Sequence, residues 1–288
     1  MPRYLDPRNP LLIKKVFGDH PHLLLSFLNA VLPLPKDAPI QSLEYLPSEQ
    51  VPEIPTFKRT IVDVKCTDRQ GRIFIVEMQM EWVNSFMQRM LFNAGRAYIK
   101  QLKKGEDYSS LYPVYALGIL NSAFDPDTAW YHHYQIVNIE NTHKQLKGLE
   151  FVFVELPKFK ASTREEKKLA ILWLRFLSDL NEKTERVSQD LLDIPEINEA
   201  CTLAEEAAYS KEELEVYWQY WDQVSTERTL MSGSRAEGKA EGKVEGKAEG
   251  EYLTKVTIAR NLIAKGMRLD EIAVITGLPL AEIETLKP

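Results

Sequence analysis

The stretch at residues 58–81 constrains the fold more than any other part of the sequence. Residues Lys58–Asp68 (KRTIVDVKCTD) alternate apolar and polar side chains and are rich in β-branched types. Arg72–Glu81 (RIFIVEMQME) continues the pattern after the short segment Arg69–Gly71 (RQG). Alternation with period two on both sides of a short glycine-containing segment indicates two strands joined by a tight turn. The sequence therefore predicts a β-hairpin here.

Two carboxylates occupy the two predicted strands. Asp63 lies between valines on the first strand, and Glu77 lies between Val76 and Met78 on the second. Gln79 shares the face of Glu77, because side chains on a strand repeat every two residues. A short hairpin allows the two acids to approach each other.

An acidic pair of this kind is a candidate metal site. Two carboxylates on adjacent strands repel each other unless a cation or a proton lies between them. Hard oxygen ligands suit Mg²⁺ or Mn²⁺, and the backbone carbonyl of Met78 is a further candidate ligand. The alternative is that Asp63, Glu77 and Gln79 form only the solvated face of an amphipathic sheet. Spacing alone leaves both interpretations open.

The rest of the chain alternates between predicted helices and strands before it becomes helical. Residues 11–32 and 84–103 show apolar positions at helical spacing. Three further strands are predicted at 112–120, 131–137 and 149–156, and helices follow at 163–182, 188–208 and 211–228. This order predicts a mixed α/β core followed by a helical C-terminal extension.

Composition narrows the class of protein. No apolar run approaches the roughly 20 residues that a membrane span needs, and we find no secretion signal, so no membrane partner is expected. The cysteines, Cys66 and Cys201, are too few for a disulfide framework or a zinc site. A cytoplasmic location is therefore expected. The formal net charge of −6 argues against a surface that wraps nucleic acid as a whole, but it allows a local basic region around an acidic site.

Residues 233–250 (GSRAEGKAEGKVEGKAEG) form a charged repeat of period four. A glycine costs a helix about 1 kcal/mol relative to alanine. Like charges also recur at i, i+4, which gives no helpful pairing. The pattern predicts a mobile linker that spans residues 231–250. A helix whose glycine stripe packs against a partner is the alternative.

Short amphipathic segments follow the repeat. Residues 253–265, 270–276 and 281–286 have the spacing of a helix-turn-helix. The last segment (LAEIETL) carries two glutamates and no base, whereas a helix that reads the major groove normally presents Arg, Lys, Asn or Gln. We therefore expect a small partner-binding module at 251–288, and the C-terminal helices are candidates for joining copies of the chain into a homo-oligomer.

Three stretches of the sequence resemble a known family of nucleases. They are LDPRNPLLIKKVFG, IVDVKCTDRQGRIFIVEMQM and MQRMLFNAGRAYIKQLKKGEDYSSLYPVYALGIL. Together they resemble the Rpn family of recombination-promoting nucleases, also described as transposases, from about residue 4 to residue 160. The resemblance implies an α/β fold with a PD-(D/E)XK restriction-endonuclease-like core, in which helices flank a mixed central sheet. The predicted segments are a nuclease-like core at 1–160, a helical extension at 161–230, the linker at 231–250 and the module at 251–288.

The resemblance also implies roles for individual residues. Asp63 is the acid of the central strand, Glu77 is the second acid, and Gln79 stands where most PD-(D/E)XK nucleases carry lysine. Gln88 and Arg89 match the family's helix motif and are candidates for contacting phosphate. The implied activity is that of a Mg²⁺-dependent endonuclease, with Mn²⁺ as a second suitable metal, that hydrolyses phosphodiester bonds in DNA. The family name links this activity to recombination or mobile elements.

The first helix departs from the family pattern. Family members carry an acid in a stretch resembling N-D-F-A-F-K, and the corresponding position here is Pro10. Asp6 and Glu44 are the candidates to replace this acid in the metal site. If neither does so, the alternative is a catalytically degenerate module that keeps the fold and binds nucleic acid or protein.

Overall fold

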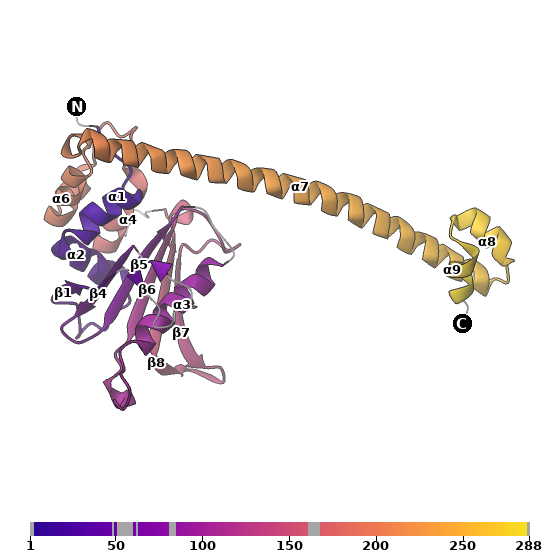
Figure 1. Ribbon diagram of the computed structural model, residues 1–288, viewed down its shortest axis with the longest axis horizontal. Helices are drawn as coiled ribbons and strands as arrows, with labels where there is room; N and C mark the ends of the chain where they lie inside the picture. Colours follow the sequence, from indigo (N-terminus) through magenta and orange to yellow (C-terminus); the bar gives the residue numbers. More distant parts are fainter. Residues whose placement is uncertain are drawn as a thin grey trace. The chain divides into compact units, whose positions relative to one another are not determined.

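The computed structural model describes residues 3–47, 49–50, 60–61, 63–80, 85–160 and 168–286 (Figure 1). The chain divides into two compact units, Met1–Val224 and Ser225–Pro288. Buried apolar side chains form separate clusters in the two units. The residues predicted for the metal and DNA sites all belong to the first unit.

A six-stranded mixed sheet forms the centre of the first unit. In spatial order its strands are β1 (Leu43–Tyr45), β4 (Val64–Asp68), β5 (Ile73–Gln79), β6 (Val114–Leu120), β8 (Asn141–Glu155) and β7 (Tyr131–Asn138). β5, β6 and β8 run parallel, and the pairs β1–β4, β4–β5 and β7–β8 are antiparallel. β2 (Glu49–Gln50) and β3 (Thr60–Ile61) form a separate ladder. The predicted mixed sheet is confirmed, and β4–β5 confirms the predicted hairpin from Val64 onward. Thr60–Ile61, predicted as part of its first strand, pair with β2 instead, and residues 58–59 and 62 lie outside the described ranges.

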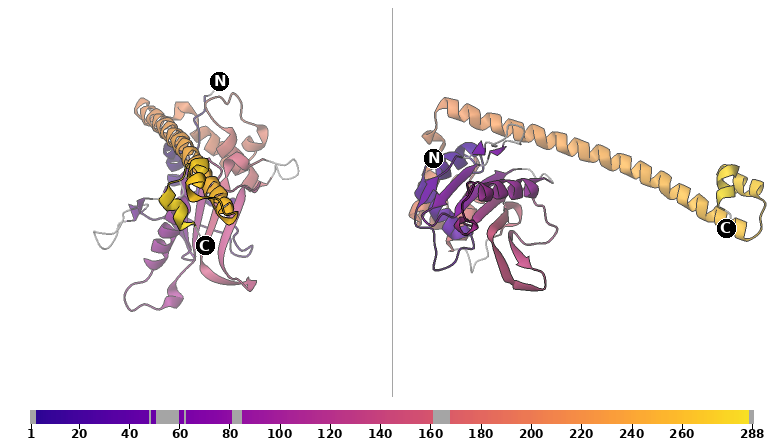
Figure 2. Two further views of the ribbon diagram at one scale, coloured as in Figure 1. Left: turned by 90° about the vertical axis from the view of Figure 1, so that its right-hand side faces the viewer. Right: turned by 60° about the horizontal axis from the view of Figure 1, so that its bottom comes forward.

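Helices cover both faces of this sheet (Figures 1 and 2). The N-terminal helices and the helices after residue 168 share one core with the sheet: α1 (Pro10–Ile13), the π-helical turn Lys14–Gly18, α2 (Pro21–Val31), α4 (Leu169–Asp179), α5 (Gln189–Leu192) and α6 (Pro195–Leu203). In this core Trp173 packs against Phe17 and Phe27, with ring centroids 5.6 and 5.8 Å apart. Within the predicted extension, α4, α5 and α6 therefore share a core with the sheet.

The opposite face of the sheet carries α3 (Phe86–Ile99). Its apolar stripe packs against Ile75 of β5 and Ala116 of β6. At Gly118 of β6, β8 and α3 together leave no room for a side chain, because a Cβ there would lie 2.8 Å from Phe153 Cδ1 and 3.0 Å from Phe86 Cε1. Short 3₁₀ turns lie at Tyr108–Ser110, Leu156–Lys158 and Glu206–Ala208.

α7 (Lys211–Ala264) is one continuous helix that includes the charged repeat. The backbone of 233–250 is therefore helical, as in the alternative to the mobile linker, and the packing of its glycine stripe against a partner stays a prediction. Apart from its glycines, the repeat consists mainly of alanine, glutamate and lysine, which are strong helix formers and offset the cost of each glycine. The boundaries predicted for the linker and the module stay predictions.

The second unit continues with α8 (Leu269–Thr276) and α9 (Leu280–Thr285). Ala259, Ile272, Leu278 and Ile283 form its buried core. Gly277 has a φ of 68°, so a glycine in the left-handed region ends α8 between the two predicted short helices. Among the helices in the described ranges, none is long and apolar enough to cross a membrane.

Candidate active site

The register of the β4–β5 hairpin aligns the two predicted acids. Val64 pairs with Val76, and the pairing continues to Thr67 opposite Ile73. One step further along the same register places Asp63 opposite Glu77. Cross-strand neighbours of this kind have Cβ atoms about 4.5–5.5 Å apart. The hairpin therefore brings together the two acids that the sequence singles out.

Asp63 was predicted within a strand, but it lies at a bend just before β4. Its carboxylate Oδ2 accepts the backbone N–H of Met78 at 2.5 Å. A side-chain acceptor thus takes this backbone donor next to the end of the β4–β5 ladder. The structure brings Met78 to Asp63 through its N–H, and the predicted ligand role of the Met78 carbonyl stays a prediction.

The turn of the hairpin is held by a buried ion pair. Asp68 Oδ1 accepts the backbone N–H groups of Gln70 and Arg72, each at 3.0 Å. Asp68 Oδ2 lies 2.8 Å from Arg72 Nε and 2.6 Å from a second guanidinium nitrogen. Gly71 supplies the positive φ of 79° that the turn requires. These contacts fix the register that sets Asp63 opposite Glu77.

Side chains of α3 hold Glu77 in place. Glu77 is 4% exposed, and its carboxylate accepts Asn93 Nδ2 at 2.7 Å and Arg89 Nε at 3.3 Å. The Arg89 guanidinium also donates to Gln79 Oε1 at 2.6 Å. Arg89, predicted to contact phosphate, is thus bound to both predicted site residues on β5. Gln88 is exposed at the preceding position of the helix, so the two members of the motif point in different directions.

The pKa values of both acids are raised. Burial raises the pKa of Glu77, although Arg89 and Asn93 stabilise its charged form. Desolvation by surrounding protein atoms raises the pKa of Asp63 to about 6, and repulsion by Glu77 adds to the shift, while the Met78 N–H and Arg89 oppose it. Solvent still reaches the Asp63 side chain. A cation between the acids would relieve this repulsion.

A row of polar and cationic side chains follows one stripe of α3. Arg89, Asn93, Arg96 and Lys100 are spaced i, i+4, i+7, i+11, which places them on one side of a helix. Lys65, on β4, belongs to the same region: burial lowers its pKa, and repulsion by Lys100 and Arg96 lowers it further.

Sequence reasoning missed Lys65 and Asn93. The signals available were the position of Lys65 two residues after Asp63, on the same face of the strand, and the helical spacing of Asn93 from Arg89. Neither signal is specific, because both spacings are common on any amphipathic hairpin or helix.

The two candidates for the missing first-helix acid have different surroundings. Asp6 is buried and its carboxylate is bound by Arg8. Arg8 also reaches Asn121, whose backbone N–H donates to the carbonyl of Gln79. Glu44 pairs with Thr67, four residues from Asp63 along the hairpin strand, or about 13 Å at the rise of a strand. A metal-binding role for either acid stays a proposal.

The donor set of the site fits a hard divalent cation. No group of three or more His, Cys, Asp and Glu side chains that could hold a metal occurs in the described parts of the chain. Mg²⁺, however, is commonly held by one or two carboxylates, together with waters and substrate phosphate. Asp63 and Glu77 supply two such carboxylates with raised pKa values.

Comparison with known proteins bears on the first unit. No curated protein and no solved structure matches the chain significantly. The family model of the PD-(D/E)XK nuclease family transposases matches residues 7–228, well past the limit of about 160 that the sequence resemblance suggests. The match includes the hairpin, α3 and the helices packed on the sheet. Such nucleases typically use divalent metals and act on DNA, and the narrower Rpn assignment stays a prediction. The chain belongs to the PD-(D/E)XK nuclease family transposases.

Proposed function

We propose that this chain is a metal-dependent DNA endonuclease that hydrolyses phosphodiester bonds at Asp63 and Glu77. The observation that carries the proposal is the hairpin register, which sets the two acids opposite each other beneath α3. Recombination or mobile-element biology is the context that the family suggests. Incubation of supercoiled plasmid with the protein and Mg²⁺ or Mn²⁺, with EDTA as control, tests the activity directly.

Each side chain of the site has a distinct proposed task. Asp63 and Glu77 would hold Mg²⁺ or Mn²⁺, which when bound lowers the pKa of water and stabilises charge on the scissile phosphate. Asn93 and Arg89 orient the Glu77 carboxylate from α3. Arg89 also fixes the amide of Gln79, so that its position relative to the acids is set before substrate binds.

The cationic side chains of α3 and β4 provide a local surface for DNA on a protein whose net charge is negative. Lys65, Arg89, Arg96 and Lys100 bring four positive charges to the region of the two acids. Most non-specific affinity for DNA comes from neutralising phosphates in this way. The overall charge of −6 is thus compatible with a DNA-binding face at α3 and β4.

Metal binding should raise the melting temperature. A ligand at 100 times its Kd stabilises a fold by about 2.7 kcal/mol, which corresponds to a rise of about 5–10 °C for a domain of this size. We expect this rise with Mg²⁺ or Mn²⁺ at pH 7.5 and none for Asp63→Asn. Because the pKa of Asp63 is raised to about 6, protons compete with the metal below that pH, and the rise should shrink there. An equal rise in Asp63→Asn, measured by scanning fluorimetry, would place the metal elsewhere.

Removing the charge of Lys65 should weaken duplex binding. Lys65→Met keeps the apolar stem of the side chain, and we expect several-fold lower affinity with a salt slope smaller by about 1, for any duplex sequence. Lys183→Met removes the same charge from an exposed loop position and serves as the control. Fluorescence anisotropy without divalent metal, from 50 to 200 mM salt, measures both quantities. If the affinity of wild type and that of Lys65→Met fall with the same slope as salt rises, Lys65 does not contact DNA.

A catalytically degenerate binding module is the second candidate function. The observation that favours it is the first helix, where Pro10 begins α1 and the nearby acid Asp6 is bound by Arg8. Duplex binding without cleavage under any divalent metal would support this candidate. Plasmid cleavage that depends on Glu77 would exclude it.

A further inference from the structure

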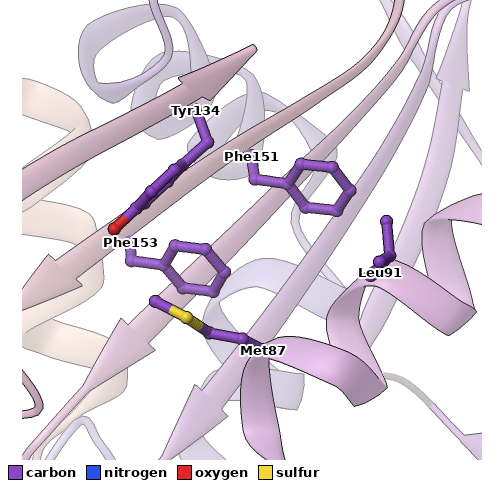
Figure 3. A pocket seen from close by; sticks show the side chains of 5 residues that line it. All are labelled: Met87, Leu91, Tyr134, Phe151 and Phe153. Atoms are coloured by element: carbon purple, nitrogen blue, oxygen red, sulfur yellow. The ribbon is translucent and has the colours of Figure 1, made fainter. Parts of the chain in front are cut away.

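A small apolar pocket opens between α3 and the strands β7 and β8 (Figure 3). Its lining consists of Met87 and Leu91 from α3, Tyr134 from β7, and Phe151 and Phe153 from β8. Leu91 is 54% and Tyr134 42% exposed, so the pocket is open to solvent. Its volume of about 170 Å³ is below the roughly 300–1,000 Å³ of sites for small molecules. This size suits a single side chain of a protein partner better than a small molecule.

Aromatic rings make up the sheet side of the pocket. Tyr134 and Phe153 meet nearly edge to face, with ring centroids 5.8 Å apart and ring planes at 73°. Phe151 pairs with Tyr134 across the two strands, so a third ring lies next to them. The face of an aromatic ring is electrically negative and attracts a cation placed over it. Rings at an angle to one another are therefore suited to hold a cation that carries apolar groups.

Acidic side chains lie close to these rings. Burial raises the pKa of the Tyr134 hydroxyl, and neighbouring negative charges raise it further. The charges belong to Asp125, Glu155 and Asp127, in decreasing order of effect. The surroundings of the pocket thus add negative charge to the negative faces of its rings.

The loop that carries the two aspartates is tied to the wall of the pocket. The Phe124 ring packs against Phe153 with centroids 6.1 Å apart, and the Phe124 N–H donates to Glu155 at 3.0 Å. Lys158 Nζ donates to the carbonyl of Asp125 at 2.7 Å and to the Glu155 carboxylate at 2.9 Å. The position of this loop is therefore set before a partner binds, which lowers the cost of binding.

Glu155 has cationic partners within the protein, whereas the two aspartates do not. The Glu155 carboxylate pairs with His132 at 2.7 Å and with Lys158 at 2.9 Å. The carboxylates of Asp125 and Asp127 accept backbone N–H groups of their own loop, at 2.9 and 2.8 Å, and neither forms an ion pair in the part of the chain that the structure describes. Two carboxylates beside the pocket thus remain available to a positively charged partner.

We propose that the pocket binds an arginine side chain presented by a partner protein. The guanidinium is the cation found most often over aromatic rings, and because it is planar it can stack on one. Its N–H groups can donate to Asp125 and Asp127, while its apolar stem packs on the side chains of α3. Arginine is also enriched among the residues that anchor protein interfaces. This inference is independent of the proposed nuclease activity.

Nuclear magnetic resonance of the full chain, labelled with ¹³C at its methionine methyl groups, tests the pocket. The chain has 7 methionines, and a Met87→Leu protein identifies the signal of Met87. Ethylguanidinium is the probe for the head of arginine, and ethylurea is its uncharged counterpart of similar shape. We expect ethylguanidinium to shift the Met87 signal to saturation, with an affinity several-fold higher than that of ethylurea.

Two variants separate the effects of ring and charge from that of an apolar cavity. Tyr134→Leu keeps an apolar lining but removes a ring face, and it should weaken ethylguanidinium binding about twofold to fivefold, the worth of an exposed cation–π contact. Asp125→Asn combined with Asp127→Asn should weaken it by a similar factor and reduce its dependence on salt. Asp37→Asn is the matched control, because Asp37 is an exposed loop acid outside the pocket, and it should bind both probes as wild type does.

Three results would overturn the proposal. One is a Met87 signal that ethylguanidinium leaves unchanged. Another is equal affinity of wild type for ethylguanidinium and ethylurea, or unchanged ethylguanidinium binding by both variants, which would make the pocket a site for an apolar side chain. The third is a change of oligomeric state in Tyr134→Leu on size-exclusion chromatography, which would make the pocket a contact between copies of the chain.

Discussion

Glu77→Gln should lower the rate of Mg²⁺-dependent plasmid cleavage by about 100-fold or more. A bound metal contributes several kcal/mol of charge stabilisation to the reaction, and each 1.36 kcal/mol is a factor of ten in rate. Glutamine has nearly the shape of glutamate, and its Oε1 can still accept Asn93 Nδ2, so the fold should survive. The measurement is the initial rate of nicking at saturating Mg²⁺, with the melting temperature of each protein as a check on folding.

Glu150→Gln is the matched control for this experiment. Glu150 also lies on a strand of the sheet, β8, two strands from β5, and its carboxylate pairs with His133 at 3.0 Å. We expect its cleavage rate to stay within about twofold of wild type, in line with the small worth of exposed ion pairs. A Glu77→Gln protein that nicks plasmid as fast as Glu150→Gln would show that the chemistry, if present, occurs elsewhere.

Asp68→Ala should destabilise the first unit by about 3–5 kcal/mol, the cost of leaving a buried charge without its partner. The Arg72 side chain is 7% exposed, and its guanidinium is bound by the Asp68 carboxylate and by the Ala38 carbonyl. For a domain of this size the melting temperature should fall by about 10 °C. Thermal unfolding followed by circular dichroism measures the change.

Two comparisons separate this loss from a general effect of removing an aspartate. Asp179→Ala breaks an exposed i, i+4 pair with Arg175 and should cost at most about 1 kcal/mol. Asp68→Ala combined with Arg72→Met replaces the pair with apolar groups and should recover much of the stability. If Asp68→Ala melts where Asp179→Ala does, the buried pair does not hold the hairpin.

Local patterns predicted the hairpin and its acids well. The period-two alternation and the Arg69–Gly71 turn depend on neighbouring residues only, so β4, β5 and the opposition of Asp63 and Glu77 could be inferred from the sequence. The limits of the strand could not. Asp63 lies outside β4 because its carboxylate binds the Met78 N–H, a contact between side chain and backbone that an alternation pattern does not encode.

Contacts between distant elements were beyond the sequence. Arg89 was assigned to phosphate from the family's helix motif, and nothing in the sequence shows that α3 also runs over β5, where Glu77 and Gln79 bind the guanidinium. Its contact with phosphate stays a prediction. The charged repeat is a different case. Glycine at every fourth position weighs against a helix by propensity, yet the three residues between successive glycines favour one, and propensity alone does not decide between such opposed terms.

The geometry of the site depends on the small volume of Gly118 as well as on the charges of its polar residues. Its backbone supports the first turn of α3, and that helix in turn holds Arg89 and Asn93 against Glu77. Even a methyl group at this position must push Phe86 or Phe153 aside. The polar contacts of Glu77 thus depend on the absence of a side chain at Gly118, where Phe86 and Phe153 pack against the strand. In related chains, a larger residue at this position would signal that the helix, and with it the acid, sits differently, even where every polar residue of the site is retained.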